Sequence, residues 1–224
     1  MLNTENIKNL LNQILVSKKI LRFINITVIP ALIFFSLSLI GLKSAGFQII
    51  EILRDPAQQS GASSFLGFLS NIGIWLWISS AAISFFFAMT NNIFGRKNLK
   101  GLLFLTGMLS ILLAVDDFFM IHDRYVNQNI CYLIYAILLG SLFIRHFKMI
   151  IAIDGFAFLS AGIFLASSIF TDLIQSRIPL NYEYTQVIEE GFKFIGAATW
   201  LYFNCRVASS LLVPATERLQ SNKG

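Results

Sequence analysis

Residues 112–123 read LLAVDDFFMIHD, a mostly apolar run that carries three carboxylates and one imidazole. On membrane-insertion scales a carboxylate at the centre of a spanning helix costs about 3 kcal/mol, so two adjacent carboxylates need partners, protonation or a wet cavity. A second polar stretch, QVIEEGFK at residues 186–193, lies inside the last apolar run. The second stretch is the best candidate partner for the first, and we expect both to face one pocket.

The composition predicts an integral membrane protein. Of the 224 residues, 56% are hydrophobic and 13% are charged, and the mean hydropathy is +0.70. Soluble domains are usually less than half apolar. The net charge of +5 comes from short basic clusters between apolar runs, which are typical of membrane topology signals. We find no basic stripe with interleaved aromatic residues, so nucleic acid is excluded as a partner.

Run length and periodicity predict an all-α fold, a polytopic membrane helical bundle. Residues 1–19 place apolar side chains at helical spacing, which predicts an amphipathic interfacial helix. Residues 20–213 form a six-helix transmembrane domain, and residues 214–224 form a polar cytoplasmic tail. A short surface helix is expected at residues 47–53. The six predicted spans are residues 20–42, 65–90, 101–122, 130–147, 149–173 and 184–209.

The lysines and arginines predict the orientation of the bundle. Six spans put both termini on one side of the membrane, and basic residues concentrate on the cytoplasmic side. Twelve basic residues fall on the side of the termini, namely Lys8, Lys18, Lys19, Arg22, Arg96, Lys97, Lys100, Arg145, Lys148, Arg206, Arg218 and Lys223. Four fall on the other side, namely Lys43, Arg54, Arg124 and Arg177. Both termini are therefore expected in the cytoplasm.

This topology brings ionisable residues from three helices to one depth, in the outer half of the bilayer. They are Asp116, Asp117, His122 and Asp123 on the third span, Asp172 on the fifth, and Glu189, Glu190 and Lys193 on the sixth. Ionisable groups inside a membrane are usually functional, so this cluster is the candidate site.

Helical geometry limits which of these groups can meet. At about 100° per residue, Asp116 and Asp123 point nearly the same way, whereas Asp117 and His122 lie on opposite flanks. We expect Asp116 to act with Asp123, and His122 to join them where the helix frays. On the sixth span, Lys193 is spaced to bridge both Glu189 and Glu190.

Two kinds of chemistry suit this set. As metal ligands, Asp116, Asp117, His122, Asp123, Asp172 and Glu190 would hold a divalent ion such as zinc, iron or manganese. As catalytic groups, Asp116, Glu189 and Glu190 would serve as acid and base, with Lys193 as charge partner. The structural alternative is that Glu189, Glu190 and Lys193 only lock the last helix, while Asp116 and Asp123 mark a wet vestibule.

Two local resemblances add to this interpretation. Residues 189–193, EEGFK, resemble the EExxK opening of one bacterial family of membrane-embedded glutamic proteases. The combination of DDxxxxHD at residues 116–123 with EExxK is similar to a group of uncharacterised multi-spanning bacterial membrane proteins. The second resemblance implies a shared site but no activity. We expect the protein to lie in the bacterial inner membrane.

The leading hypothesis is a metal-assisted hydrolase of a lipid or of a membrane-embedded amide or ester. The first alternative is a proton- or cation-coupled transporter. The second is a non-catalytic subunit or receptor that binds a membrane protein partner. Membrane lipids are expected partners in each case, and His146, beside Arg145 and Lys148, is expected to contact headgroups. A continuous polar path from Asp116 inward past Ser110 and Thr106 would favour transport, whereas a closed floor would favour an enzyme or receptor.

Overall fold

The computed structural model describes residues 21, 24–53, 56–63, 65–90, 97–177 and 181–212. Within these ranges all regular elements are helices, which confirms the all-α class. The chain divides into two units, residues 1–66 and 67–224, and each is described by itself. The predicted amphipathic helix of residues 1–19 and the tail of residues 214–224 lie outside the described residues.

Within its described residues, the first unit shows one long helix followed by two short ones. A π-helical stretch, η1 (Ile24–Val28), leads into α3 (Ile29–Ser44), and α4 (Ile49–Leu53) and α5 (Pro56–Ser60) follow. Pro30 stands in the first turn of α3, directly after η1. Beyond α3, Gly46 adopts a φ of +100°, which turns the chain away from the helix axis.

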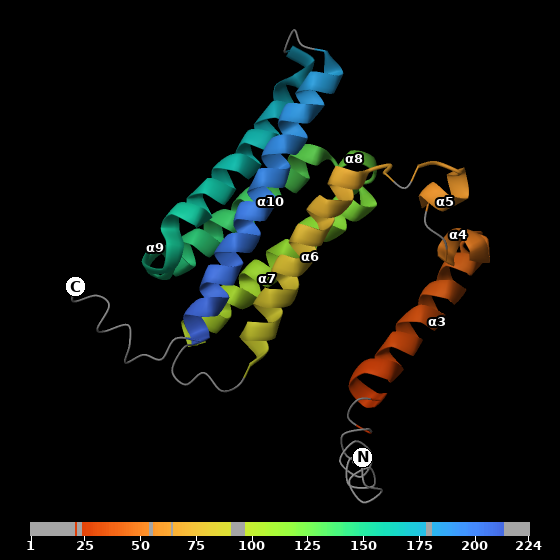
Figure 1. Ribbon diagram of the computed structural model, residues 1–224, viewed down its shortest axis with the longest axis horizontal. Helices are drawn as coiled ribbons and strands as arrows, with labels where there is room; N and C mark the ends of the chain where they lie inside the picture. The colour runs from red at the N-terminus through yellow and green to blue at the C-terminus, as the bar shows by residue number, and fades with distance from the viewer. Residues whose placement is uncertain are drawn as a thin grey trace, which may run out of the picture. The chain divides into compact units, whose positions relative to one another are not determined.

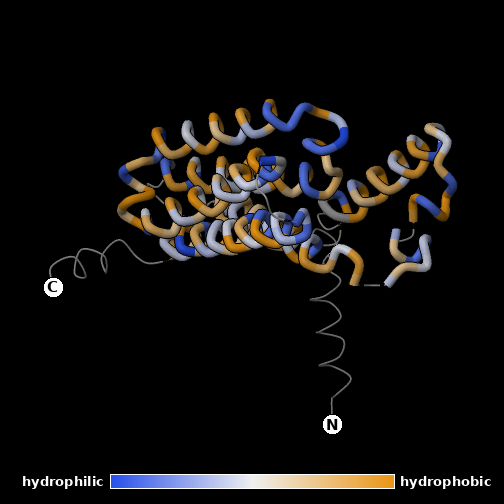
Figure 2. The backbone as a smooth tube through the Cα atoms, turned by 90° about the horizontal axis from the view of Figure 1, so that it is seen from above, coloured by the Kyte–Doolittle hydropathy of each residue, from blue (hydrophilic) through white to orange (hydrophobic). Residues whose placement is uncertain are grey.

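The second unit holds the candidate site. Its elements are α6 (Phe68–Met89), α7 (Lys97–Phe119), α8 (Ile121–Arg124), α9 (Gln128–Ile174), η2 (Gln175–Arg177) and α10 (Tyr182–Leu212). Among the described residues, three helices are long and apolar enough to cross a membrane, at Phe68–Met89, Asn98–Phe119 and Gln128–Ile174. Hydrophobic residues recur along these helices (Figure 2), which is compatible with the predicted membrane protein. The six predicted spans stay a prediction.

Helix α9 folds back on itself to form a hairpin of two arms (Figure 1). The backbone leaves helical geometry at His146 and at Asp154. Across the two arms, the rings of Phe143 and Phe158 stack with centroids 5.5 Å apart. Asp154 begins the second arm as a helix cap, since its Oδ1 accepts the N–H of Ala157 at 3.0 Å. The arms are therefore antiparallel neighbours.

The core of this unit lies where α10 packs along α9 and α6, and where α6 packs along α7. Trp77, Trp200 and Phe203 are fully buried there. Buried polar groups join the same helices: the Nδ2 of Asn204 donates to the Oγ of Ser80 at 2.7 Å, and the Oγ of Ser84 donates to the Oδ1 of Asn204 at 3.1 Å. Such hydrogen bonds hold helices together where lipid removes the hydrophobic driving force.

Gly196 allows the closest approach between α9 and α10. A Cβ at this position would lie 2.8 Å from two side-chain carbons of Leu165 and 3.2 Å from its backbone nitrogen. At Gly191, five residues earlier on α10, a Cβ would meet nothing within 4 Å. We expect Gly196→Ala to lower the Tm of the purified protein, at a cost of about 1–3 kcal/mol from overpacking.

Gly191→Ala is the matched control for this substitution. It removes a flexible residue from a helix without a clash, so it is expected to raise the Tm slightly, by a gain of about 1 kcal/mol or less in helix propensity. Thermal unfolding in detergent measures both variants. Equal Tm values for the two would contradict the close approach of α9 to Gly196.

Candidate functional site

The end of α7 is shaped by a left-handed residue. Met120 adopts φ 52° and ψ 46°, and it separates α7 from the single turn of α8. This break folds the chain back, so that the N–H of His122 donates to Asp116 Oδ1 at 2.9 Å. The ring Nδ1 of His122 lies 2.7 Å from Asp116 Oδ2. On an unbroken helix these two residues would point about 120° apart.

His122 is held between two carboxylates. Its Nε2 lies 3.3 Å from Asp123 Oδ1, on the side of the ring opposite Asp116. Asp116 is buried, whereas Asp123 is exposed. The expected pairing of Asp116 with Asp123 on one face is replaced by this arrangement, because the helix breaks between them. The hydrogen bond with Asp116 raises the pKa of His122 above its ordinary value, against the opposing effect of burial.

Asp117 joins three helices. Its Oδ2 accepts the indole N–H of Trp77, on α6, at 3.0 Å, and its Oδ1 lies 3.9 Å from the Nζ of Lys193, on α10. The Lys193 ammonium donates to Glu190 Oε1 at 2.6 Å. Lys193 therefore bridges Asp117 and Glu190, not the expected pair of Glu189 and Glu190.

Asp172 and Glu189 belong to a second chain of hydrogen bonds. Asp172 accepts from the Tyr132 hydroxyl and from the Gln175 side chain, both at 2.7 Å. Gln186 donates to Gln175 at 3.3 Å and to Glu189 Oε2 at 2.9 Å. The two side-chain amides thus connect Asp172 to Glu189.

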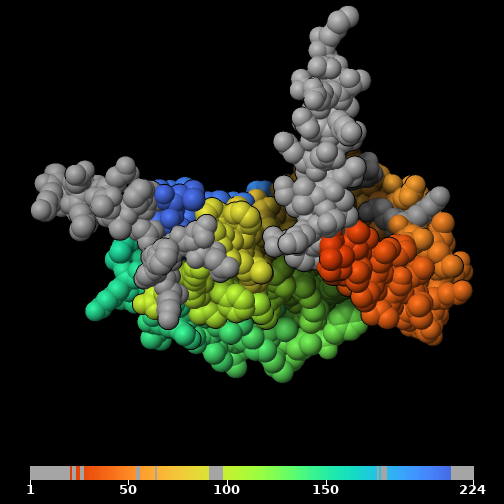
Figure 3. Space-filling view, turned by 90° about the horizontal axis from the view of Figure 1, so that it is seen from below, coloured from red at the N-terminus to blue at the C-terminus, as the bar shows by residue number. Residues whose placement is uncertain are grey.

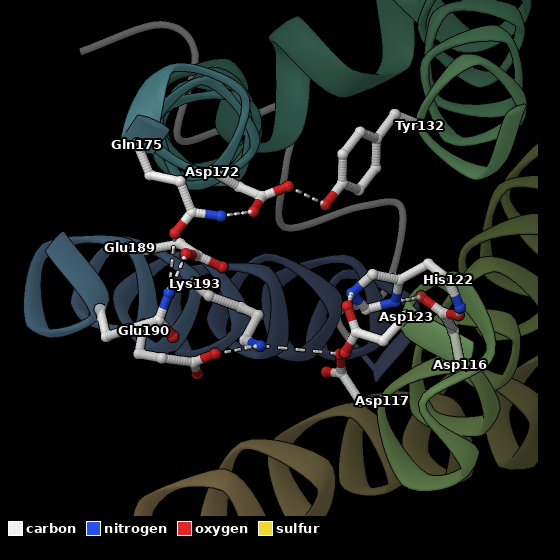
Figure 4. A network of polar contacts seen from close by, with 11 residues as sticks. Asp116, Asp117, His122, Asp123, Tyr132, Asp172, Gln175, Glu189, Glu190 and Lys193 are labelled. Carbon is white, nitrogen blue, oxygen red and sulfur yellow. Dashed lines mark hydrogen bonds and ion pairs between the residues drawn. The ribbon is translucent and has the colours of Figure 1, made fainter. Parts of the chain in front are cut away.

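The two groups of contacts face one cavity of about 200 Å³. Figure 4 shows the side chains of α7, α9 and α10 pointing toward one another around it. Of the predicted residues, the structure brings five to the cavity wall, namely Asp116, Asp117, His122, Glu189 and Lys193. Three further predicted residues do not line the cavity, but each contacts a side chain that does. They are Asp123, Asp172 and Glu190. Apolar side chains of α7 and α9 complete the lining, among them Leu113 and Leu165.

Three aromatic residues of this site were not identified from the sequence as functional. Trp77 binds Asp117, Tyr132 binds Asp172, and Tyr135 lies beside Asp116. Tryptophan and tyrosine in apolar runs are typical of lipid contact and of membrane interfaces. The sequence did contain one signal for the tyrosines: Tyr132 and Tyr135 are three residues apart, which places both on one face of a helix.

The predicted metal ligands do not converge among the described residues. No group of three or more histidine, cysteine, aspartate or glutamate side chains in those ranges is placed to hold a metal ion. Both oxygens of Asp116 contact His122, and the amide of Gln186 occupies Glu189 Oε2. The zinc, iron or manganese centre stays a prediction, and the observed arrangement is a network of hydrogen bonds and ion pairs.

The floor of the cavity is closed by packed polar groups. Trp200 lines the cavity and donates its indole N–H to Ser110 at 2.8 Å. Ser110 in turn contacts Ser80 at 3.2 Å, and Thr106 contacts Ser84 at 3.4 Å. Both Ser110 and Thr106 are fully buried. Asn204 connects Ser80 to Ser84, so these groups form one buried hydrogen-bond network below the cavity. The choice between a transporter and an enzyme or receptor stays a prediction.

A second cavity adjoins the first. This apolar groove, of about 750 Å³, runs between α7 and the first arm of α9. It shares Asp116, Leu109 and Tyr135 with the first cavity, and it extends to Arg145 at its other end. The groove therefore links the two ends of the bundle along one side.

Residues 25–207 match a family described as a domain of unknown function (DUF8692). The chain belongs to this family. The matched range includes both polar stretches and every residue of the cavity wall, so the candidate site lies within the DUF8692 domain. No curated protein and no solved structure matches the chain.

The charge on His122 predicts a pH-dependent stability. The pKa of His122 is raised in the folded protein, so folding favours the charged imidazole and its contact with Asp116. The full stabilisation is present below the ordinary histidine pKa of about 6.5. It is lost as the pH rises through the raised pKa of the folded state. We expect the Tm difference between wild type and His122→Gln to be largest near pH 6 and to shrink at higher pH. Val126→Ala, a nearby change that removes no charge, should give a constant difference. A difference that grows with pH would mean that His122 is held neutral.

The backbone at Met120 predicts an unusual order of substitutions. In the left-handed region a β-branched residue is strained by about 1–2 kcal/mol, whereas glycine is not. We expect Met120→Gly to be more stable than Met120→Ile in thermal unfolding. At Met108, within α7, the order should reverse, because glycine costs about 1 kcal/mol in a helix. If glycine and isoleucine ranked in the same order at both positions, the left-handed break of the helix at Met120 would be contradicted.

Proposed function

We propose that this member of the DUF8692 family is a membrane-embedded hydrolase that cleaves an ester or amide bond in a lipid or lipid-linked substrate. The observation that carries the proposal is the cavity in which His122, paired with Asp116 at 2.7 Å, and Lys193 and Glu189 line one space. The remaining walls are mostly apolar, so the cavity suits a substrate that partitions into the membrane.

The proposed membrane arrangement has six spans and both termini in the cytoplasm of a bacterial inner membrane. The spans are η1 with α3, α6, α7, the two arms of α9, and α10. Each arm of α9 contains about 20 residues, which is the length that a bilayer requires. The excess of basic residues on the side of the termini supports this orientation.

In the proposed reaction, water attacks the carbonyl carbon of the bound ester or amide. The Glu189 carboxylate takes a proton from that water, and the Lys193 ammonium stabilises the oxyanion that forms. His122, held as an imidazolium by Asp116 and Asp123, then donates a proton to the departing oxygen or nitrogen. The proton on Glu189 returns to His122 through solvent, which restores the starting state. Asp116 and Glu190 are positioning residues, because they orient His122 and Lys193.

A proton-coupled carrier is the second candidate. It is favoured by the ion pairs of Lys193 with Asp117 and Glu190, which join α7 to α10 and would change with the protonation of either carboxylate.

The hydrolase is tested with the full chain reconstituted in liposomes and a fluorogenic long-chain acyl ester as the probe. We expect hydrolysis by the wild type, and a loss in kcat of about 100-fold or more in Glu189→Gln and in His122→Gln. Glu183→Gln, an exposed change on the same helix, is the matched control and should retain the wild-type rate.

Two further measurements separate the alternatives. Stoichiometric zinc, iron or manganese in the purified protein, lost in Asp116→Asn, would replace the acid–base mechanism with a metal-assisted one. Proton flux that is lost in Glu189→Gln, without any ester or amide hydrolysis by the wild type, would favour the carrier and reject the hydrolase.

A further inference from the structure

A buried histidine at the turn of the α9 hairpin has an unsatisfied nitrogen. His146 is 8% exposed, and its Nε2 has no hydrogen-bond partner among the described residues. A buried polar group without a partner costs about 1–3 kcal/mol, so such groups are rare and call for a ligand or another explanation. The imidazole packs against the first turn of α7, where a Cβ on Gly101 would lie 3.6 Å from its Cε1.

The histidine lines a basic pocket. The pocket has a volume of about 580 Å³ and includes Arg145, Lys148 and Asn98 in its lining. No carboxylate of the described residues lies within 4.0 Å of either Arg145 or Lys148. The start of α7, a helix of 23 residues, adds the positive end of a helix dipole. The pocket thus combines two cations and one imidazole nitrogen that have no partner in the part of the chain that the structure describes.

We propose that this pocket binds the phosphate of an anionic phospholipid. The Nε2–H of His146 donates to one phosphate oxygen, and Arg145 and Lys148 neutralise the charge. The ligand supplies the partner that His146 Nε2 lacks among the described residues.

The adjoining groove favours a lipid over free phosphate. Arg145 lines both the basic pocket and the apolar groove between α7 and α9. An acyl chain attached to the bound phosphate can therefore enter the groove directly, and the distance along α9 from Arg145 to Tyr135 is about 15 Å at the helical rise. In Figure 3 the blue-green hairpin and the yellow-green start of α7 lie next to each other, where the phosphate would sit.

This site is separate from the candidate active site. The turn of the α9 hairpin and the start of α7 lie at the end of the bundle away from α8 (Figure 1). Lipid binding at the basic pocket therefore does not depend on the proposed hydrolysis, and either can fail without the other.

The test titrates three probes into the purified full chain in neutral detergent and follows the Tm. Phosphatidylglycerol carries both phosphate and acyl chains, diacylglycerol carries only the chains, and inorganic phosphate carries only the headgroup charge. Because a ligand that binds the folded state raises the Tm, we expect a clear rise with phosphatidylglycerol and a much smaller one with the other two. A rise with diacylglycerol or inorganic phosphate equal to that with phosphatidylglycerol would overturn the proposal.

Variants locate the effect. Arg145→Gln and His146→Leu should each weaken the apparent affinity for phosphatidylglycerol by about tenfold or more, and His146→Gln should restore much of it, because its amide can donate from a similar position. Arg177→Gln, which removes one exposed charge from η2, is the matched control and should bind like the wild type. If His146→Leu does not fold, the affinities of Arg145→Gln and Lys148→Gln for phosphatidylglycerol test the site instead. Unchanged affinity in these two, or an equal loss in Arg177→Gln, would reject the site.

Discussion

The pairing of charges inside an apolar helix bundle is the constraint on which the rest of the second unit depends. The side chains of Asp117 and Lys193 are mostly shielded from solvent between helices, and neither can be left alone there without a large desolvation cost. Their contacts with each other, with Trp77 and with Glu190 therefore fix how α6, α7 and α10 are rotated. Helix rotation in turn determines which side chains face the cavity.

The break at Met120 adds a local constraint to this packing. An unbroken α7 would carry His122 away from Asp116, but the left-handed residue returns both the backbone N–H and the ring of His122 to the same carboxylate. The two contacts share one acceptor group, so the carboxylate holds both the turn and the orientation of the imidazole. A strained backbone at a cavity wall is common at functional sites, because the surrounding contacts must hold it in place.

The hairpin of α9 connects the site to the far end of the bundle. Near one end of the hairpin, Tyr132 and Asp172 join the two arms, and through Gln175 and Gln186 they set the position of Glu189. At the other end, the turn places His146 against α7 and leaves its Nε2 without a partner. One folded-back helix thus shapes both the polar cavity and the basic pocket, and the groove between α7 and α9 runs from one to the other.

The sequence by itself determined the membrane class, the helical fold and the two polar stretches, because hydropathy and run length are local properties that survive any packing. It also placed Asp117 and Lys193 close enough in depth to meet. Only the tertiary structure decided that Asp116 binds His122 and not Asp123, that Trp77 and Tyr132 belong to the site, and that Lys193 bridges Asp117 and Glu190. These outcomes depend on helix rotation, on one left-handed residue and on the fold-back of α9, and each arises from contacts between residues far apart in the chain.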